Sequence, residues 1–154
     1  KAQVDAGADF IGVGNAVASL VGPAPYEEFA VEYDRRLVEY IHGLGAKVKL
    51  HICGNTTAIL PLIRDRVKPD IMDVDWMVDF EKAVQVFAGS RTAVNGNMDP
   101  VNVMLKGDEK TVRGAVGHCI AVSGANTCVA AGCEIPAATP LENLRALCEP
   151  LPAA

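Results

Sequence analysis

The segment AKVKLHICGN, residues 46–55, decides the fold because it joins a short strand to a polar end. A short run bounded by Gly45 and Gly54 predicts a strand over residues 46–52. Its carboxyl end carries His51, Cys53 and Asn55, which a strand does not need. In parallel α/β folds, active sites are built at the carboxyl ends of the strands. This segment therefore predicts both a parallel sheet and the position of its site.

The rest of the chain repeats this alternation of strand and helix. Strands are expected at residues 9–14, 46–52, 70–74, 92–95 and 126–131. Helices are expected at residues 25–44, 56–66, 79–87, 100–106, 109–123 and 140–148, with Asp79, Asp99 and Thr139 as caps. Alternation of this kind predicts an α/β fold with parallel strands and outer helices. An open doubly wound sheet and a (β/α)8 barrel both fit the pattern.

Length separates these two architectures. A (β/α)8 barrel takes about 250 residues, so five βα units in 154 residues are too few to close one. A barrel fold therefore implies that the first strands are absent. The chain also begins at Lys1, inside a predicted helix and without Met. We expect residues 1–154 to be a single domain, a fragment of a barrel that lacks its N-terminal strands.

Composition excludes several classes of protein. Half of the residues are hydrophobic, which excludes a disordered chain, and no run of about 18 uncharged apolar residues predicts a transmembrane helix. The formal net charge of −5, without a basic patch, argues against nucleic acid as a partner. Five cysteines, an odd count without a secretory signal, argue against a disulfide framework. We expect a cytoplasmic protein with reduced thiols.

Three residues form a predicted zinc site. His51 and Cys53 lie two apart, so they point to the same side of the strand, and Cys133 follows the fifth strand at the matching place. One histidine and two cysteines suit tetrahedral zinc with an open fourth position. Two thiolates and a neutral imidazole leave Zn²⁺ formally neutral, which favours binding and activating a substrate thiol. This chemistry points to alkylation of a thiol rather than hydrolysis.

Several motifs together resemble the uroporphyrinogen decarboxylase superfamily, most closely its methylcobalamin:coenzyme M methyltransferase branch. They are GADFI at 7–11, HICGN at 51–55, GNMDP at 96–100 and GCEIP at 132–136. The resemblance spans nearly the whole chain and implies the C-terminal portion of a (β/α)8 TIM barrel. It implies zinc at His51, Cys53 and Cys133, and transfer of a methyl group from a corrinoid cobalt to a zinc-bound thiol. The cobalamin-carrier signature Asp-x-His-x-x-Gly is absent, so methylcobalamin would come free or on a partner corrinoid protein.

Further polar residues at the strand ends are candidates for the pocket. The pocket candidates are Asp75, Asn97 and Asp99, and the candidates for cofactor binding are Asn15, Ser19, Asn55 and Trp76. Asp75 is a candidate acceptor for the second nitrogen of His51. Each candidate also has a structural alternative, because Asp99 can simply cap a helix and the asparagines can close turns. Cys119 and Cys128 are expected to pack in the core.

Two other functions stay open at this point. A decarboxylase acting on a porphyrinogen or a related acid predicts no dependence on metal. A truncated, inactive half-barrel predicts zinc binding without turnover, and self-association through exposed sheet edges. The leading hypothesis remains a zinc-dependent methyltransferase that uses a corrinoid donor and a small thiol acceptor such as coenzyme M, with a homo-oligomer formed through the barrel edges.

Overall fold

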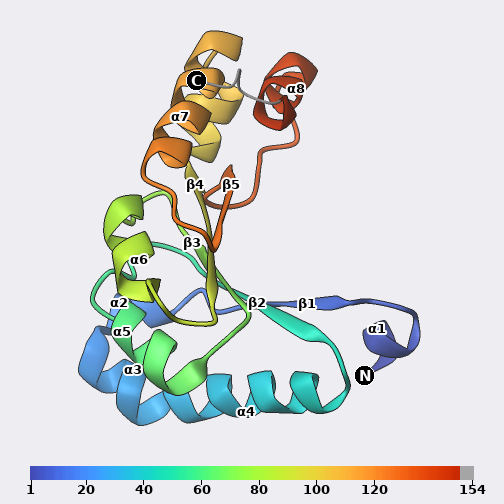
Figure 1. The fold of residues 1–154 in the computed structure, drawn as a ribbon, viewed down its shortest axis with the longest axis vertical. Coiled ribbons are helices and arrows are strands. Elements are labelled where there is room, and N and C mark those ends of the chain that lie inside the picture. The colour runs from blue at the N-terminus through green and yellow to red at the C-terminus, as the bar shows by residue number, and fades with distance from the viewer. Residues whose placement is uncertain (150–154) are drawn as a thin grey trace.

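The computed structural model describes residues 1–149, which form one five-stranded parallel sheet (Figure 1). The strands are β1 (Phe10–Gly14), β2 (Lys47–Ile52), β3 (Ile71–Val74), β4 (Ala93–Met98) and β5 (Thr127–Ala131). Their order in the sheet follows their order in the chain, and every neighbouring pair is parallel. A doubly wound sheet reverses its strand order at a switch point, and this sheet does not. The predicted α/β fold is confirmed, as part of a TIM barrel.

Helices connect successive strands. They are α1 (Ala2–Asp5), α2 (Ala18–Val21), α3 (Pro23–Phe29), α4 (Val31–Gly43), α5 (Leu60–Leu62), η1 (Ile63–Val67), α6 (Phe80–Phe87), η2 (Pro100–Leu105), α7 (Glu109–Ala121) and α8 (Leu141–Cys148). The side chains of Asp79 and Asp99 accept hydrogen bonds from the first turns of α6 and η2, which confirms both predicted caps. Thr139 does not cap α8, whose N-cap is Pro140. The single helix expected over 25–44 is interrupted at Ala30, where φ is −117°.

The two faces of the sheet differ in character. One face is covered by helices, and its side chains are buried and apolar: Val48, Leu50, Ile52, Met72, Val74, Val94 and Met98. The register places one row across the other face, consisting of Gly14, His51, Asp73, Asn95 and Cys128. This row lacks a helical cover, and Cys128 is therefore exposed rather than in the core, contrary to expectation. Cys119, on α7, is buried as predicted.

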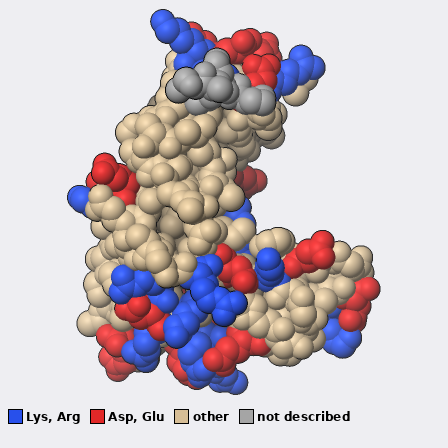
Figure 2. Space-filling model, viewed as in Figure 1, with Lys and Arg blue, Asp and Glu red and all other residues tan. Residues whose placement is uncertain are grey.

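The sheet twists strongly, so the molecule has two arms that meet at an angle (Figure 1). One arm holds β1, β2 and α4, and the other holds β4, β5, α7 and α8. Charged side chains of both signs are interleaved over the lower arm, whereas the middle of the upper arm is largely uncharged (Figure 2). Within residues 1–149, β1 pairs only with β2 and β5 only with β4. No helix in this part of the chain has the length and apolar character needed to cross a membrane.

Candidate metal centre

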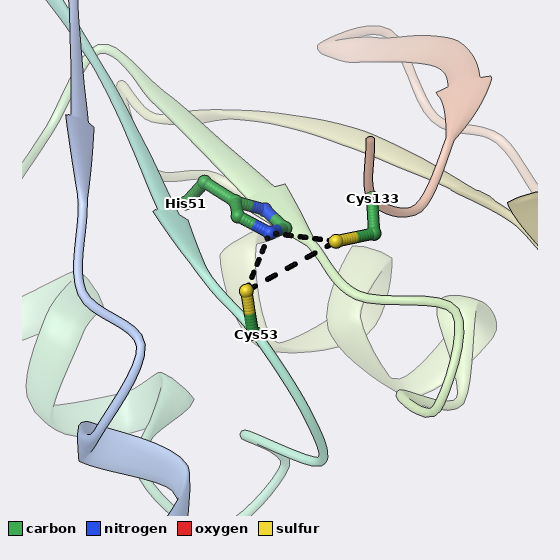
Figure 3. Close-up of side chains that lie close together, drawn as sticks. All are labelled: His51, Cys53 and Cys133. Carbon is green, nitrogen blue, oxygen red and sulfur yellow. Dashed lines mark hydrogen bonds between the residues drawn. The ribbon is translucent and has the colours of Figure 1, made fainter. Parts of the chain in front are cut away.

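The side chains of His51, Cys53 and Cys133 point toward one another at the carboxyl end of the sheet (Figure 3). The Nε2 atom of His51 lies 3.4 Å from Cys53 Sγ and 3.6 Å from Cys133 Sγ, and the two sulfur atoms are 4.0 Å apart. Around one tetrahedral zinc ion, bond lengths of about 2.3 Å to sulfur and 2.1 Å to nitrogen separate the donors by about 3.6–3.8 Å. The spacing of the three donors therefore fits a single zinc ion.

Two backbone features bring Cys133 to this position. The Gly132 amide donates a hydrogen bond to the Met98 carbonyl, 2.8 Å away, which ties the segment after β5 to the end of β4. Gly132 also packs directly against the backbone after β3, because a Cβ atom there would lie 2.4 Å from the Trp76 amide nitrogen. The absence of a side chain at Gly132 lets the two segments meet. Cys133 is thereby carried across two intervening strands toward β2.

The other ring nitrogen of His51 faces Asp73 on the neighbouring strand. His51 Nδ1 lies 3.1 Å from the Asp73 carbonyl oxygen and 3.4 Å from Asp73 Oδ2. Asp75, the residue expected to play this part, instead accepts a hydrogen bond from the Met77 amide at 2.9 Å. The sequence reasoning missed Asp73. The sequence did offer one sign that Asp73 has a role, because it is a charged residue inside the short apolar stretch 70–74.

The carboxylate of Asp73 is held from both sides. Asn95, on β4, donates a hydrogen bond to Asp73 Oδ1, and Lys49 Nζ, on β2, lies 3.0 Å from Asp73 Oδ2. Burial alone would raise the pKa of Asp73, but the bonds from His51, Lys49 and Asn95 outweigh it and hold the pKa below its usual range. Asp73 is therefore a charged carboxylate with three partners on the uncovered face of the sheet.

The same contact controls the protonation of His51 in the metal-free chain. The hydrogen bond to Asp73 is the main cause that raises the pKa of His51 to about 10, against the opposing effect of burial, and the two cysteines add to the rise. A metal that binds Nε2 needs the neutral imidazole, so its binding must release this proton.

The remaining candidates have structural contacts around the site. Asn97 Nδ2 donates to the carbonyls of Asp75, at 3.1 Å, and Val78, at 2.6 Å, which closes the loop after β3. Trp76 belongs to the same loop and is 44% exposed. Asp99 caps η2 through the amides that follow it. These contacts place Asn97 and Asp99 in the framework that shapes the site.

The candidates near β1 and β2 shape two turns. Asn15 Oδ1 accepts from the amides at the start of α2, and its Nδ2 lies 3.4 Å from Asp34 Oδ2. Asn55 Oδ1 accepts from the Thr57 amide at 3.1 Å. Ser19 packs on Gly54, where a Cβ atom would lie 2.7 Å from its hydroxyl oxygen. Ser19 therefore lies directly over the turn that follows Cys53.

An open cavity of about 300 Å³ adjoins the cluster and is lined by Gly12, Val13, Gly14, Lys49, His51 and Asp73. The two glycines leave it open, since a Cβ atom on either would meet nothing within 4 Å. A second cavity, of about 330 Å³, lies near the opposite ends of β4 and β5 and contains none of the candidate residues. Of these two cavities, the first has His51 in its wall and room for a small molecule.

Comparisons with known proteins agree with this architecture. A family model for uroporphyrinogen decarboxylase (URO-D) matches residues 1–151. The methylcobamide:CoM methyltransferase MtbA of Methanosarcina mazei is 34% identical over 151 residues, which cover 97% of this chain and 43% of the relative. A uroporphyrinogen decarboxylase of Gloeobacter violaceus is 31% identical over 122 residues, covering 79% of this chain and 34% of the relative.

A solved structure of a methyltransferase from Methanosarcina mazei matches with a TM-score of 0.81 at 30% identity. The match covers 95% of this chain and 42% of that structure, so the chain spans less than half the length of these relatives. The family match covers nearly all of the sequence, and the sheet order and the uncovered face are those of a partial barrel. This chain belongs to the uroporphyrinogen decarboxylase (URO-D) family.

Proposed function

We propose that this chain is the metal-binding part of a zinc-dependent, corrinoid-linked methyltransferase, which moves a methyl group from a methylated cobamide to a small thiol. The observation that carries the proposal is the cluster of His51, Cys53 and Cys133, whose donor atoms all lie within 4.8 Å of one another. Several of the matched relatives are named methylcobamide:CoM methyltransferases. These names support a methylated cobamide as the methyl donor and a small thiol as the acceptor. Because the chain covers 43% of such a relative, the activity is proposed for the whole protein.

The donor set favours a thiol as the fourth ligand. Cys53 and Cys133 would contribute two thiolates and His51 a neutral imidazole, so the charge of Zn²⁺ would be balanced before substrate binds. When bound there, zinc would lower the pKa of a coordinated thiol and hold its thiolate in place. The three-residue set leaves room for one such ligand in a tetrahedral shell.

The residues around the cluster would receive the acceptor. The cavity beside His51 is large enough for a small thiol. Gly12 and Gly14 line it without placing a side chain in it. In the transfer, the thiolate sulfur would form the S–CH₃ bond while the Co–C bond breaks and its electron pair stays on cobalt. We propose that the corrinoid is delivered free or by a partner protein.

The first experiment measures zinc in the purified chain by elemental analysis. We expect about one zinc per chain in the wild type, with loss of bound zinc in Cys53→Ser and in Cys133→Ser, because each variant removes one of three donors. Cys128→Ser is the matched control, since Cys128 lies on β5 close to the site in sequence but is exposed and outside the cluster. It should keep the wild-type zinc content.

A second measurement follows thiol methylation from methylcobalamin in the same preparations. Loss of methylcobalamin absorbance and formation of the thioether should depend on both cysteines of the cluster. A folded wild-type chain that binds no zinc would refute the proposed site. Zinc-loaded protein that never methylates a thiol, even when completed with the remainder of its barrel, would instead favour the inactive, zinc-binding alternative.

A further inference from the structure

Asp73 lies where it can act on the proposed zinc site through His51. The imidazole of His51 is contacted at both nitrogens, with Nε2 facing the two sulfur atoms and Nδ1 facing Asp73. The Asp73 residue offers two acceptors to Nδ1, its carbonyl oxygen at 3.1 Å and its carboxylate Oδ2 at 3.4 Å. An acceptor at Nδ1 keeps the proton on that nitrogen and leaves the lone pair of Nε2 for a metal.

Asp73 brings a carboxylate to a largely buried position in the sheet. Asp73 is 8% exposed and lies in a sheet row whose other members include Gly14 and Asn95. Its side chain is fixed by bonds from both flanking strands, since Lys49 contacts Oδ2 and Asn95 contacts Oδ1. A carboxylate held in this way is rigid and charged. The oxygen that Lys49 contacts, Oδ2, is also the one that lies 3.4 Å from His51 Nδ1.

Asp73 and Lys49 bring opposite charges to the same place beside His51. The Lys49 ammonium offsets the charge of the Asp73 carboxylate, and both groups lie beside the cavity that adjoins the cluster. A carboxylate that accepts a hydrogen bond from the second ring nitrogen of a metal-bound histidine makes that histidine a stronger ligand. A nearby cation instead opposes the binding of Zn²⁺. Asp73 and Lys49 should therefore influence zinc affinity in opposite directions, although they form one ion pair.

We propose that Asp73 is a positioning residue that fixes the ring orientation and tautomer of His51 for zinc, and that Lys49 moderates this effect by sharing the carboxylate. The inference rests on the proposed function, because it concerns the same metal centre. It assigns a role to two residues on the uncovered face of the sheet that do not themselves bind the metal.

The test compares zinc affinities by competition with a chromophoric chelator. Asp73→Asn keeps the size of the side chain and the backbone carbonyl but removes the charge, and it should weaken zinc binding about 10- to 100-fold. Lys49→Met should leave the affinity unchanged or make it tighter. Asp70→Asn is the matched control, because Asp70 also contacts a histidine, His42, at 2.7 Å, but at the opposite end of the sheet. It should keep the wild-type affinity.

A second readout reports the ring directly. Nitrogen NMR of the zinc-loaded chain should show His51 protonated at Nδ1 in both proteins, and the Nδ1–H proton should resonate further downfield in the wild type than in Asp73→Asn, because only the wild type offers it a carboxylate. A purely structural ion pair would make both Asp73→Asn and Lys49→Met weaken zinc binding, which would overturn the inference. Wild-type zinc affinity in folded Asp73→Asn would overturn it as well, since the carbonyl alone would then suffice. Absence of zinc from the wild type would instead overturn the proposed function.

Discussion

Replacing Gly132 with alanine tests how closely the site depends on one backbone contact. The new Cβ atom would lie 2.4 Å from the Trp76 amide nitrogen, 2.8 Å from its Cα atom and 3.0 Å from the carbonyl carbon of Asp75. All three are backbone atoms, so no flexible side chain can move aside. The segment that carries Cys133 must therefore shift away from the loop after β3.

The size of the shift follows from ordinary contact distances. Relief of the closest contact needs a displacement of about 1 Å, and overpacking of this kind costs about 1–3 kcal/mol. For a chain of this length, each kcal/mol lowers the melting temperature by about 2–4 °C. Zinc sites tolerate errors of only about 0.2 Å in ligand distance, so Cys133 would be displaced beyond the range of good coordination. We expect zinc affinity to fall at least about tenfold, although all three ligands remain.

The assay pairs thermal unfolding of the metal-free chain with chelator competition on the zinc-loaded chain. Gly114→Ala is the matched control, because a Cβ atom at Gly114 in α7 would meet nothing within 4 Å. That control should gain about 0.5–1 kcal/mol of stability and keep its zinc affinity. Gly132→Ala protein with wild-type zinc affinity and an unchanged melting temperature would refute the reasoning, because it would mean that the close approach of the two segments has no structural consequence.

Three further predictions concern stability. Asp99→Ala should lower the free energy of unfolding by about 1 kcal/mol in urea titrations because η2 loses its cap, whereas Asp99→Asn should retain most of it. Tyr26→Phe should cost about 1.5–3 kcal/mol, because the buried Tyr26 hydroxyl donates at 2.8 Å to the Asp34 carboxylate, which is also buried; an unchanged urea midpoint would contradict this. Partial burial of Asp70 favours its neutral form, but bonds from the Val48 amide and His42 outweigh this effect and lower its pKa. The carboxylate thus stabilises the folded chain above its unfolded pKa, and the stability difference between wild type and Asp70→Asn should be present at pH 7, begin to fall near pH 4 and disappear only as the pH drops through the lower pKa of the folded chain; a difference independent of pH would exclude this linkage.

The sequence predicted the features that depend on spacing along one strand. His51 and Cys53 share a side of the chain because they lie two residues apart. The ends of four strands could be placed from the polar residues that follow them, but β4 continues to Met98, past the end predicted at residue 95. The fold class was predictable for the same reason, since it needs only the alternation of strands and helices. Asp99 as a cap was predictable from its position before Pro100.

The features that depend on pairing between strands were not predictable. The register sets His51 opposite Asp73 rather than beside Asp75, and no local pattern fixes that offset of 22 residues. The exposure of Cys128 has the same origin, because it depends on which face of the sheet the helices cover. The interruption at Ala30 was also missed, since neither glycine nor proline marks it.

The three proposed zinc ligands are unevenly spaced along the chain, and this spacing has a consequence for synthesis. His51 and Cys53 leave the ribosome together, but Cys133 follows 80 residues after Cys53, an interval of about 4–16 s at ordinary translation rates. During that interval the nascent chain offers two donors, which bind metal loosely. A zinc ion captured at the end would join the second strand of the sheet to the last. Metal occupancy would thus report whether translation and folding had reached the fifth strand, and prematurely terminated chains would leave the cellular zinc pool largely untouched.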